Sequence, residues 1–192
     1  MAARRRPVLV AMLGLLAPVP AAAMDALTVF GGRFTANHWE DFFLSPGAID
    51  FRDAWLVAVA PSWELARLSP RLSLEAEAQV GRYIGDQRNW EVNALVAARY
   101  RLSGPEAPVR ASLAFGLGPS WASQKPVLER RVSDNGDSSR WLVYWYMEAA
   151  AAPRAWGPWS ALIRLHHRSG AYGRVAEAGG SNTPTLGIRR RF

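Results

Sequence analysis

The feature that most constrains the fold of this chain is a set of segments in which apolar and polar residues alternate with a period of two. Residues 72–80 read Leu-Ser-Leu-Glu-Ala-Glu-Ala-Gln-Val, so every second side chain is apolar. Successive side chains of a β-strand point to opposite faces of the sheet, and the pattern therefore predicts a strand with one apolar and one polar face. Similar alternation follows Trp90, Val109, Trp141 and Ala161. The chain is predicted to be all-β.

The alternating segments and their connections predict a specific architecture. Eight strands are expected, at residues 25–34, 51–64, 70–83, 89–103, 107–121, 139–152, 156–168 and 181–192. Long polar loops alternate with short turns along the chain; the longest loops are 35–50, 122–138 and 169–180. An even number of alternating segments joined in this way is typical of an eight-stranded antiparallel up-and-down transmembrane β-barrel with a polar interior.

The N-terminus has the pattern of an export signal. Arg4, Arg5 and Arg6 precede an apolar stretch, which ends in three alanines at 21–23. A basic region, a short apolar region and a small-residue site predict a secretory signal peptide over 1–23 and a barrel domain over 24–192. The formal charge of +7 then falls to +4, from 20 basic and 16 acidic residues. Because no long basic block remains, nucleic acid is not an expected partner.

The composition excludes several kinds of site. The chain has no cysteine, which rules out disulfides, a thiol nucleophile and thiolate-bound metals. Its three histidines have no metal-ligand spacing, and no glycine-rich phosphate loop is present. We expect neither a cofactor nor a metal ion.

Charged residues share one strand face, and side-chain parity alone does not decide whether that face lies inside a membrane barrel or outside a soluble one. In the membrane barrel, the interior residues are Glu75, Glu77, Glu91, Arg99, Arg110, Glu148 and Arg164. Eight strands enclose little more than their own side chains, so we interpret this set as a buried ion-pair network. A channel or a catalytic carboxylate pair is disfavoured.

Two features favour the membrane barrel. The last strand alternates through Leu186 and Ile188 and ends at Phe192, which resembles the terminal signal read by the barrel-assembly machinery. Tryptophans also lie near predicted strand ends, as in aromatic girdles: Trp55, Trp63, Trp90, Trp121, Trp141, Trp156 and Trp159. We therefore expect the outer membrane of a Gram-negative-type bacterium, with outer-membrane lipids as partners. Association into a homodimer is left open.

One polar cluster has the residue types of a catalytic site. If Ile163 and Leu165 face outward, His167 and Ser169 share the lipid-facing side near the extracellular rim. Residues two apart on a strand are separated by about 6–7 Å, which their side chains can bridge. A histidine and a serine so placed can act as general base and nucleophile.

The pattern His167-x-Ser169-x-Ala171, followed by a glycine-containing loop and a final strand, resembles the lipid A 3-O-deacylases. These outer-membrane barrels, related by name to acyloxyacyl hydrolases, hydrolyse an ester of lipopolysaccharide. The resemblance implies that His167 is the base, that Ser169 is the nucleophile and that lipid A is the substrate. If the chain acts on lipid A, we expect Arg168 and Arg174 to face the lipid phosphates.

The chain departs from the family pattern at two positions. The acid that orients the histidine is replaced by Asn182, and Glu177 in the preceding loop is the alternative acid. At Gly170 the family carries an asparagine that helps to hold the oxyanion, so only backbone N–H groups remain for this role here. An amide orients an imidazole but supplies no negative charge, which lowers turnover.

Two hypotheses of different class follow. The first is an ester hydrolase that removes an acyl chain from lipid A. The second is a non-catalytic small barrel with a structural or surface role, in which loops 35–50 and 122–138 meet partners.

Overall fold

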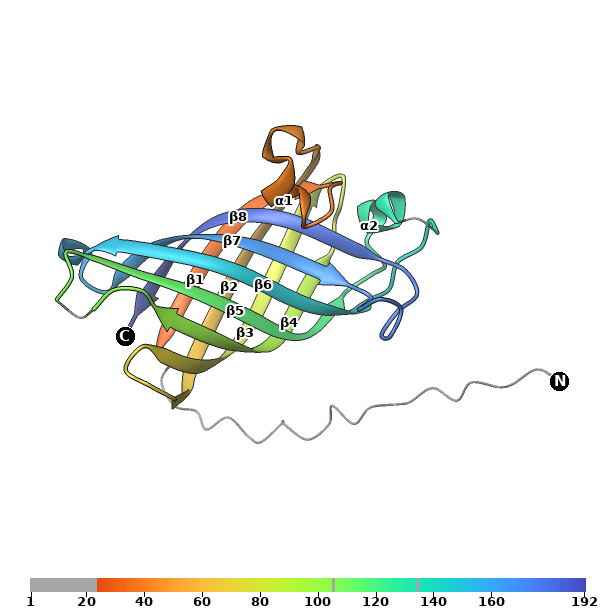
Figure 1. Ribbon diagram of the computed structural model, residues 1–192. Helices are drawn as coiled ribbons and strands as arrows, with labels where there is room; N and C mark the ends of the chain where they lie inside the picture. Colours follow the sequence, from red (N-terminus) through yellow and green to blue (C-terminus); the bar gives the residue numbers. More distant parts are fainter. Residues whose placement is uncertain (1–23, 105, 134) are drawn as a thin grey trace.

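A computed structural model describes residues 24–104, 106–133 and 135–192, which form a closed antiparallel barrel with its strands in sequence order (Figure 1). The strands are β1 (Ala26–Thr35), β2 (Phe51–Arg67), β3 (Leu72–Gly85), β4 (Trp90–Arg101), β5 (Val109–Ala122), β6 (Trp141–Pro153), β7 (Trp159–Ser169) and β8 (Gly180–Arg191). Pairing of β8 with β1 closes the sheet, so no strand edge is left unpaired.

The predicted eight-stranded up-and-down barrel is confirmed, with strand ends within a few residues of those expected. The short helices within two long loops were not predicted. They are α1 (Asp41–Leu44), a 3₁₀ turn at Pro46–Ala48 and α2 (Val127–Val132). A further 3₁₀ turn, at Arg154–Trp156, lies in the short connection after β6. The predicted signal peptide lies outside the described residues. No helix of the described chain is long and apolar enough to cross a membrane.

The two ends of the barrel differ. One, here called the turn end, carries the short connections after β2, β4 and β6 together with both ends of the folded chain, where Phe192 N–H donates to Asp25 O over 2.9 Å. The other, the loop end, carries the long connections with α1 and α2 (Figure 1).

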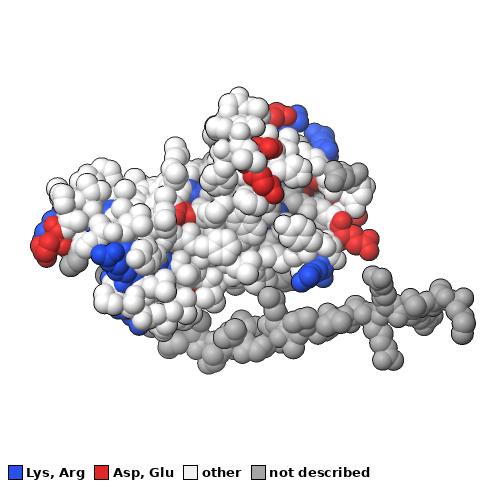
Figure 2. Space-filling model, in the orientation of Figure 1, with Lys and Arg blue, Asp and Glu red and all other residues white. Residues whose placement is uncertain are grey.

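The outer wall of the barrel is apolar around its middle. On the face shown in Figure 2, charged side chains gather toward the two ends and leave a largely uncharged band between them. Exposed residues of this wall include Val57, Val96, Leu113, Phe115, Ile163 and Leu186. Tryptophans border it: Trp90 and Trp141 begin strands at the loop end, and Trp159 begins β7 at the turn end. An apolar wall this extensive suits a lipid environment.

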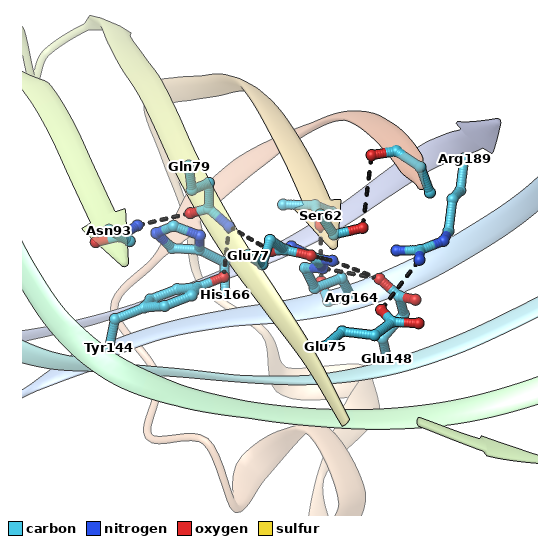
Figure 3. A network of polar contacts seen from close by, with 12 residues as sticks. Ser62, Glu75, Glu77, Gln79, Asn93, Tyr144, Glu148, Arg164, His166 and Arg189 are labelled. Atoms are coloured by element: carbon cyan, nitrogen blue, oxygen red, sulfur yellow. Dashed lines mark hydrogen bonds and ion pairs between the residues drawn. The ribbon is translucent and has the colours of Figure 1, made fainter. Parts of the chain in front are cut away.

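The interior contains an ion-pair network, part of which Figure 3 shows from close by. Of the residues expected in it, Arg110 makes no ion pair in the described chain and donates to the Trp159 carbonyl instead. The Arg164 guanidinium donates to Glu77 from Nη1 over 2.8 Å and to Glu148 from Nη2 over 2.7 Å. Arg99 joins Glu148 to Glu75, with distances of 2.9 and 3.0 Å. Because Arg164, Glu77 and Glu148 have no exposed side-chain surface, this layer blocks the lumen.

An apolar cluster lies beside the polar network, toward the loop end. Phe30, Phe34, Leu56 and Tyr83 point inward, and Leu128 of α2 packs on them. The interior is therefore less uniformly polar than predicted. In β1 and β2 both faces are apolar, so charge alternation could not show which side chains point inward.

Glu148→Gln is predicted to destabilise the barrel by about 3–5 kcal/mol, because it removes one partner from buried charges on Arg99 and Arg164. Reversible urea unfolding in detergent measures the change. The control is Glu106→Gln, which removes an exposed ion pair to Arg154 and should leave stability unchanged. Equal effects of the two substitutions would contradict an interior held together by these charges.

Candidate functional site

Near the loop end, four residues form one row across neighbouring strands. Trp145 of β6 is opposite His167 of β7, His167 is opposite Asn182 of β8, and Asn182 is opposite Thr35 of β1. Side chains of such directly opposed residues are in contact range. Nδ1 of His167 and Oδ1 of Asn182 are 2.7 Å apart. The structure thus brings together two of the residues singled out from the sequence.

A second contact fixes the orientation of the Asn182 amide. Its Nδ2 donates to the backbone carbonyl of Asn37 over 2.9 Å, which directs Oδ1 toward the imidazole. An amide oxygen only accepts, so Nδ1 of His167 must carry the proton of this hydrogen bond. In the neutral ring Nε2 is then unprotonated and free to accept a proton.

His167 is less accessible than its outward parity predicted. Only 8% of the residue surface is exposed. Its ring stacks on Trp145 with centroids 4.2 Å apart, and Trp39 of the 35–50 loop meets Trp145 edge-on at 5.9 Å. The expected lipid-facing histidine is therefore sheltered, because a loop that is distant in sequence folds against the outer wall.

Ser169 is half-buried at the last position of β7 and has the same parity as His167. Within the described chain its hydroxyl makes no hydrogen bond to His167. Such a bond often forms only when substrate is present. Ser169, His167 and Asn182 line one cavity of about 420 Å³, which also contacts Trp39 and Tyr172. The cavity gives a ligand access to the serine and the histidine together.

Gly170 follows the serine and anchors a tight turn. Its carbonyl accepts the N–H groups of Val175 and Ala176 over 3.1 and 3.3 Å. Ala171 and Tyr172 both have positive φ, 51° and 55°, a conformation that costs free energy for residues other than glycine. The two residues that follow Gly170 therefore hold the turn in an unfavourable backbone conformation. The oxyanion role of the Gly170 N–H stays a prediction.

Glu177, the alternative acid, lies in the same cavity lining but is exposed. Its backbone carbonyl accepts from Asn135, and no hydrogen bond joins its carboxylate to His167 in the described chain. Glu40 of the 35–50 loop also lines the cavity, half-buried. The sequence offered no signal for Glu40, since its position depends on how that loop folds.

Contacts inside the barrel support the two strands that carry the site. Arg168, next to His167, is fully buried, and its Nη1 donates to Glu129 of α2 over 2.6 Å. Ser181, next to Asn182, donates to the same carboxylate over 2.9 Å. The suggestion that Arg168 faces lipid phosphates is therefore wrong, because its parity directs it inward. Glu129 joins the two strands that present His167 and Asn182 outward.

In the described part of the chain, no group of three or more histidine, aspartate or glutamate side chains is arranged to hold a metal ion.

Comparisons with known proteins support the fold at low sequence identity. The outer membrane enzyme PagL superposes with a TM-score of 0.62 and 13% identity, covering 87% of this chain and 99% of PagL. Neisserial surface protein A (NspA) superposes with a TM-score of 0.52 and 12% identity, covering 87% of this chain and 96% of NspA. No protein-family model matches the chain. No curated protein matches its sequence. The architecture is thus shared by outer-membrane barrels.

Gly170→Ala is predicted to displace the 170–176 turn, because an added Cβ would collide with the Ala176 carbonyl oxygen. Overpacking of this kind costs about 1–3 kcal/mol. Faster proteolytic cleavage within 170–180 would report it. Gly47→Ala is the control, since its Cβ would meet no atom within 4 Å. Unchanged cleavage in Gly170→Ala would show that the turn is not held as described.

Proposed function

We propose that this chain is an outer-membrane ester hydrolase that removes an acyl chain from lipid A. The observation that carries the proposal is the hydrogen bond of His167 to Asn182, beside a cavity that also reaches Ser169. A sheltered histidine with a fixed tautomer is the arrangement that a serine nucleophile needs.

The proposed location follows from the barrel wall. An apolar band between two charged ends fits an outer membrane. PagL, which superposes on this chain, is an outer membrane enzyme. In such barrels the short turns face the periplasm and the long loops face outward. His167 and Ser169 then lie at the level of the outer leaflet, where lipopolysaccharide resides. Assembly-machinery recognition of Phe192 and homodimer formation remain predictions.

The proposed reaction uses three groups. Ser169 Oγ attacks the ester carbonyl while His167 Nε2 accepts its proton, and the protonated imidazole then passes that proton to the departing alcohol oxygen. Water, deprotonated by the same nitrogen, then attacks the acyl-serine carbonyl. The bond to Ser169 Oγ breaks, the fatty acid leaves, and the imidazolium returns its proton to Ser169 Oγ. Backbone N–H groups near Gly170 are the proposed donors to the oxyanion.

Asn182 is expected to lower the rate of ester hydrolysis. It holds the ring through Oδ1, but it supplies no charge to the imidazolium that forms during the reaction. Loss of the acid in a serine protease triad lowers turnover by about 10⁴-fold. We therefore propose slow catalysis.

A non-catalytic barrel is the second candidate. Two observations favour it: an amide at the position of the family acid, and the absence of a hydrogen bond between Ser169 and His167 in the described chain. Its long loops would then serve as a binding surface.

Ser169→Ala decides between the two candidates. The chain is expressed in cells that make lipopolysaccharide, and lipid A is analysed by mass spectrometry. The hydrolase predicts loss of one acyl chain, which Ser169→Ala abolishes because the nucleophile is gone. Ser160→Ala, at the opposite end of β7, is the control and should leave deacylation intact. An unchanged lipid A profile with the unsubstituted chain would refute the hydrolase.

Asn182→Glu is predicted to raise the deacylation rate by about tenfold or more, because a carboxylate can stabilise the imidazolium. The initial rate on purified lipopolysaccharide measures the effect. Asn182→Ala, which removes the contact to His167 altogether, should lower the rate. A glutamate variant no faster than the alanine variant would argue against His167 as the base.

A further inference from the structure

A second, larger cavity occupies the turn end of the barrel, on the side of the ion-pair layer away from His167. Its volume is about 960 Å³. Ligand-binding cavities span roughly 300–1,000 Å³, so the space suits a small molecule. Its lining includes seven arginines but only three carboxylate side chains, those of Asp25, Glu64 and Glu75. The cavity is strongly cationic.

Most of this positive charge lacks a carboxylate partner. Arg67 pairs with Glu64, and both Arg99 and Arg189 share Glu75. Arg99 also pairs with Glu148, which lies outside the lining. Among the residues that the structure describes, the four remaining arginines of the lining form no ion pair: Arg71, Arg101, Arg110 and Arg191. Arg191 is moreover within electrostatic range of Arg101 and Arg110. Arginines placed together without counter-charges repel one another, which an anion would relieve.

Buried donors in the same lining have no acceptor. Nη2 of Arg99, Nη1 of Arg189 and Nε of Arg110 are shielded from solvent and make no hydrogen bond in the structure. Arg99 and Arg189 are only 7% and 6% exposed. These three nitrogens do not themselves face the cavity. Burying a charged donor without a partner is costly, so an anion bound beside these arginines would lower that cost.

The cavity is closed on its inner side. Figure 3 shows Arg189 reaching Glu75, with Glu148 and Arg164 directly beyond them. Since Arg164, Glu77 and Glu148 have no exposed side-chain surface, the packed ion-pair layer forms the inner end of this cavity. The cavity is a cup with an arginine-rich wall.

We propose that this cup binds a multiply charged phosphate-class oxyanion. Planar guanidinium groups donate paired hydrogen bonds to phosphate oxygens, and several such groups around one space match an anion with more than one charge. Such a group can belong to a free phosphate compound or to the headgroup of an anionic phospholipid. The proposal does not depend on the hydrolase proposed above, because the two cavities lie on opposite sides of the ion-pair layer.

Calorimetric titration with pyrophosphate tests the proposal, using the folded barrel in maltoside detergent and phosphate-free buffer. The expected result is saturable binding that weakens as salt is added. The double variant Arg110→Gln/Arg191→Gln should weaken binding by about tenfold or more, because each lost charge-assisted hydrogen bond reduces affinity. Neither arginine has an ion-pair partner in the described chain, so the variant leaves no carboxylate without its partner.

The control is Arg190→Gln, since Arg190 lies over the Trp159 and Phe192 rings and does not line the cup. Its affinity should equal that of the unsubstituted chain. Folding of each variant is checked by heat-modifiable migration in gels. If the first double variant does not fold, Arg71→Gln/Arg101→Gln removes two other unpaired arginines of the lining and should weaken binding similarly.

A parallel titration with short-chain phosphatidic acid, whose phosphomonoester headgroup can carry two negative charges, distinguishes the two sources. Binding of pyrophosphate supports a free phosphate compound as the ligand. Binding of phosphatidic acid alone, lost in the double variant, supports a lipid headgroup. Binding of neither probe, or equal weakening by Arg190→Gln, overturns the proposal.

Discussion

The contact of Arg164 with Glu77 and Glu148 is the interaction on which the rest of this structure depends. An eight-stranded barrel has a narrow lumen that must be filled by its own side chains. Here the filling is charged, and each buried carboxylate of this layer meets a guanidinium from a different strand. Because these side chains leave no room for water, the layer closes the lumen and divides the molecule into two separate ends.

The two ends of the barrel carry different polar groups. At the loop end, Glu129 of α2 binds Arg168 and Ser181 from inside, while their neighbours His167 and Asn182 meet on the outside. Successive side chains of a strand point to opposite faces, so the two faces are coupled. An ion pair that holds one residue inside the barrel also sets the position of its neighbour on the outer face. At the turn end the same alternation directs arginines into a cup, with too few carboxylates to neutralise them.

Much of the fold could be predicted from the sequence. Local alternation predicts the eight strands and their inward carboxylates and arginines. It also predicts that His167, Ser169 and Asn182 share the outward face, because successive residues of a strand point to opposite faces. The partners of those residues could not be predicted. Glu129 gives no signal within its basic helix, and Trp39 meets Trp145, on which His167 stacks, only because the 35–50 loop folds back against β6.

By itself, therefore, the sequence determined eight strands and, where the alternation is strong, which side chains share a face, because these properties repeat within a single strand. The tertiary structure alone decided which residues meet. It set His167 against Asn182 and Trp145, and it gathered arginines from four strands and one turn around one cavity. Such contacts depend on the register between strands and on loops that are distant in sequence, and no local pattern encodes either.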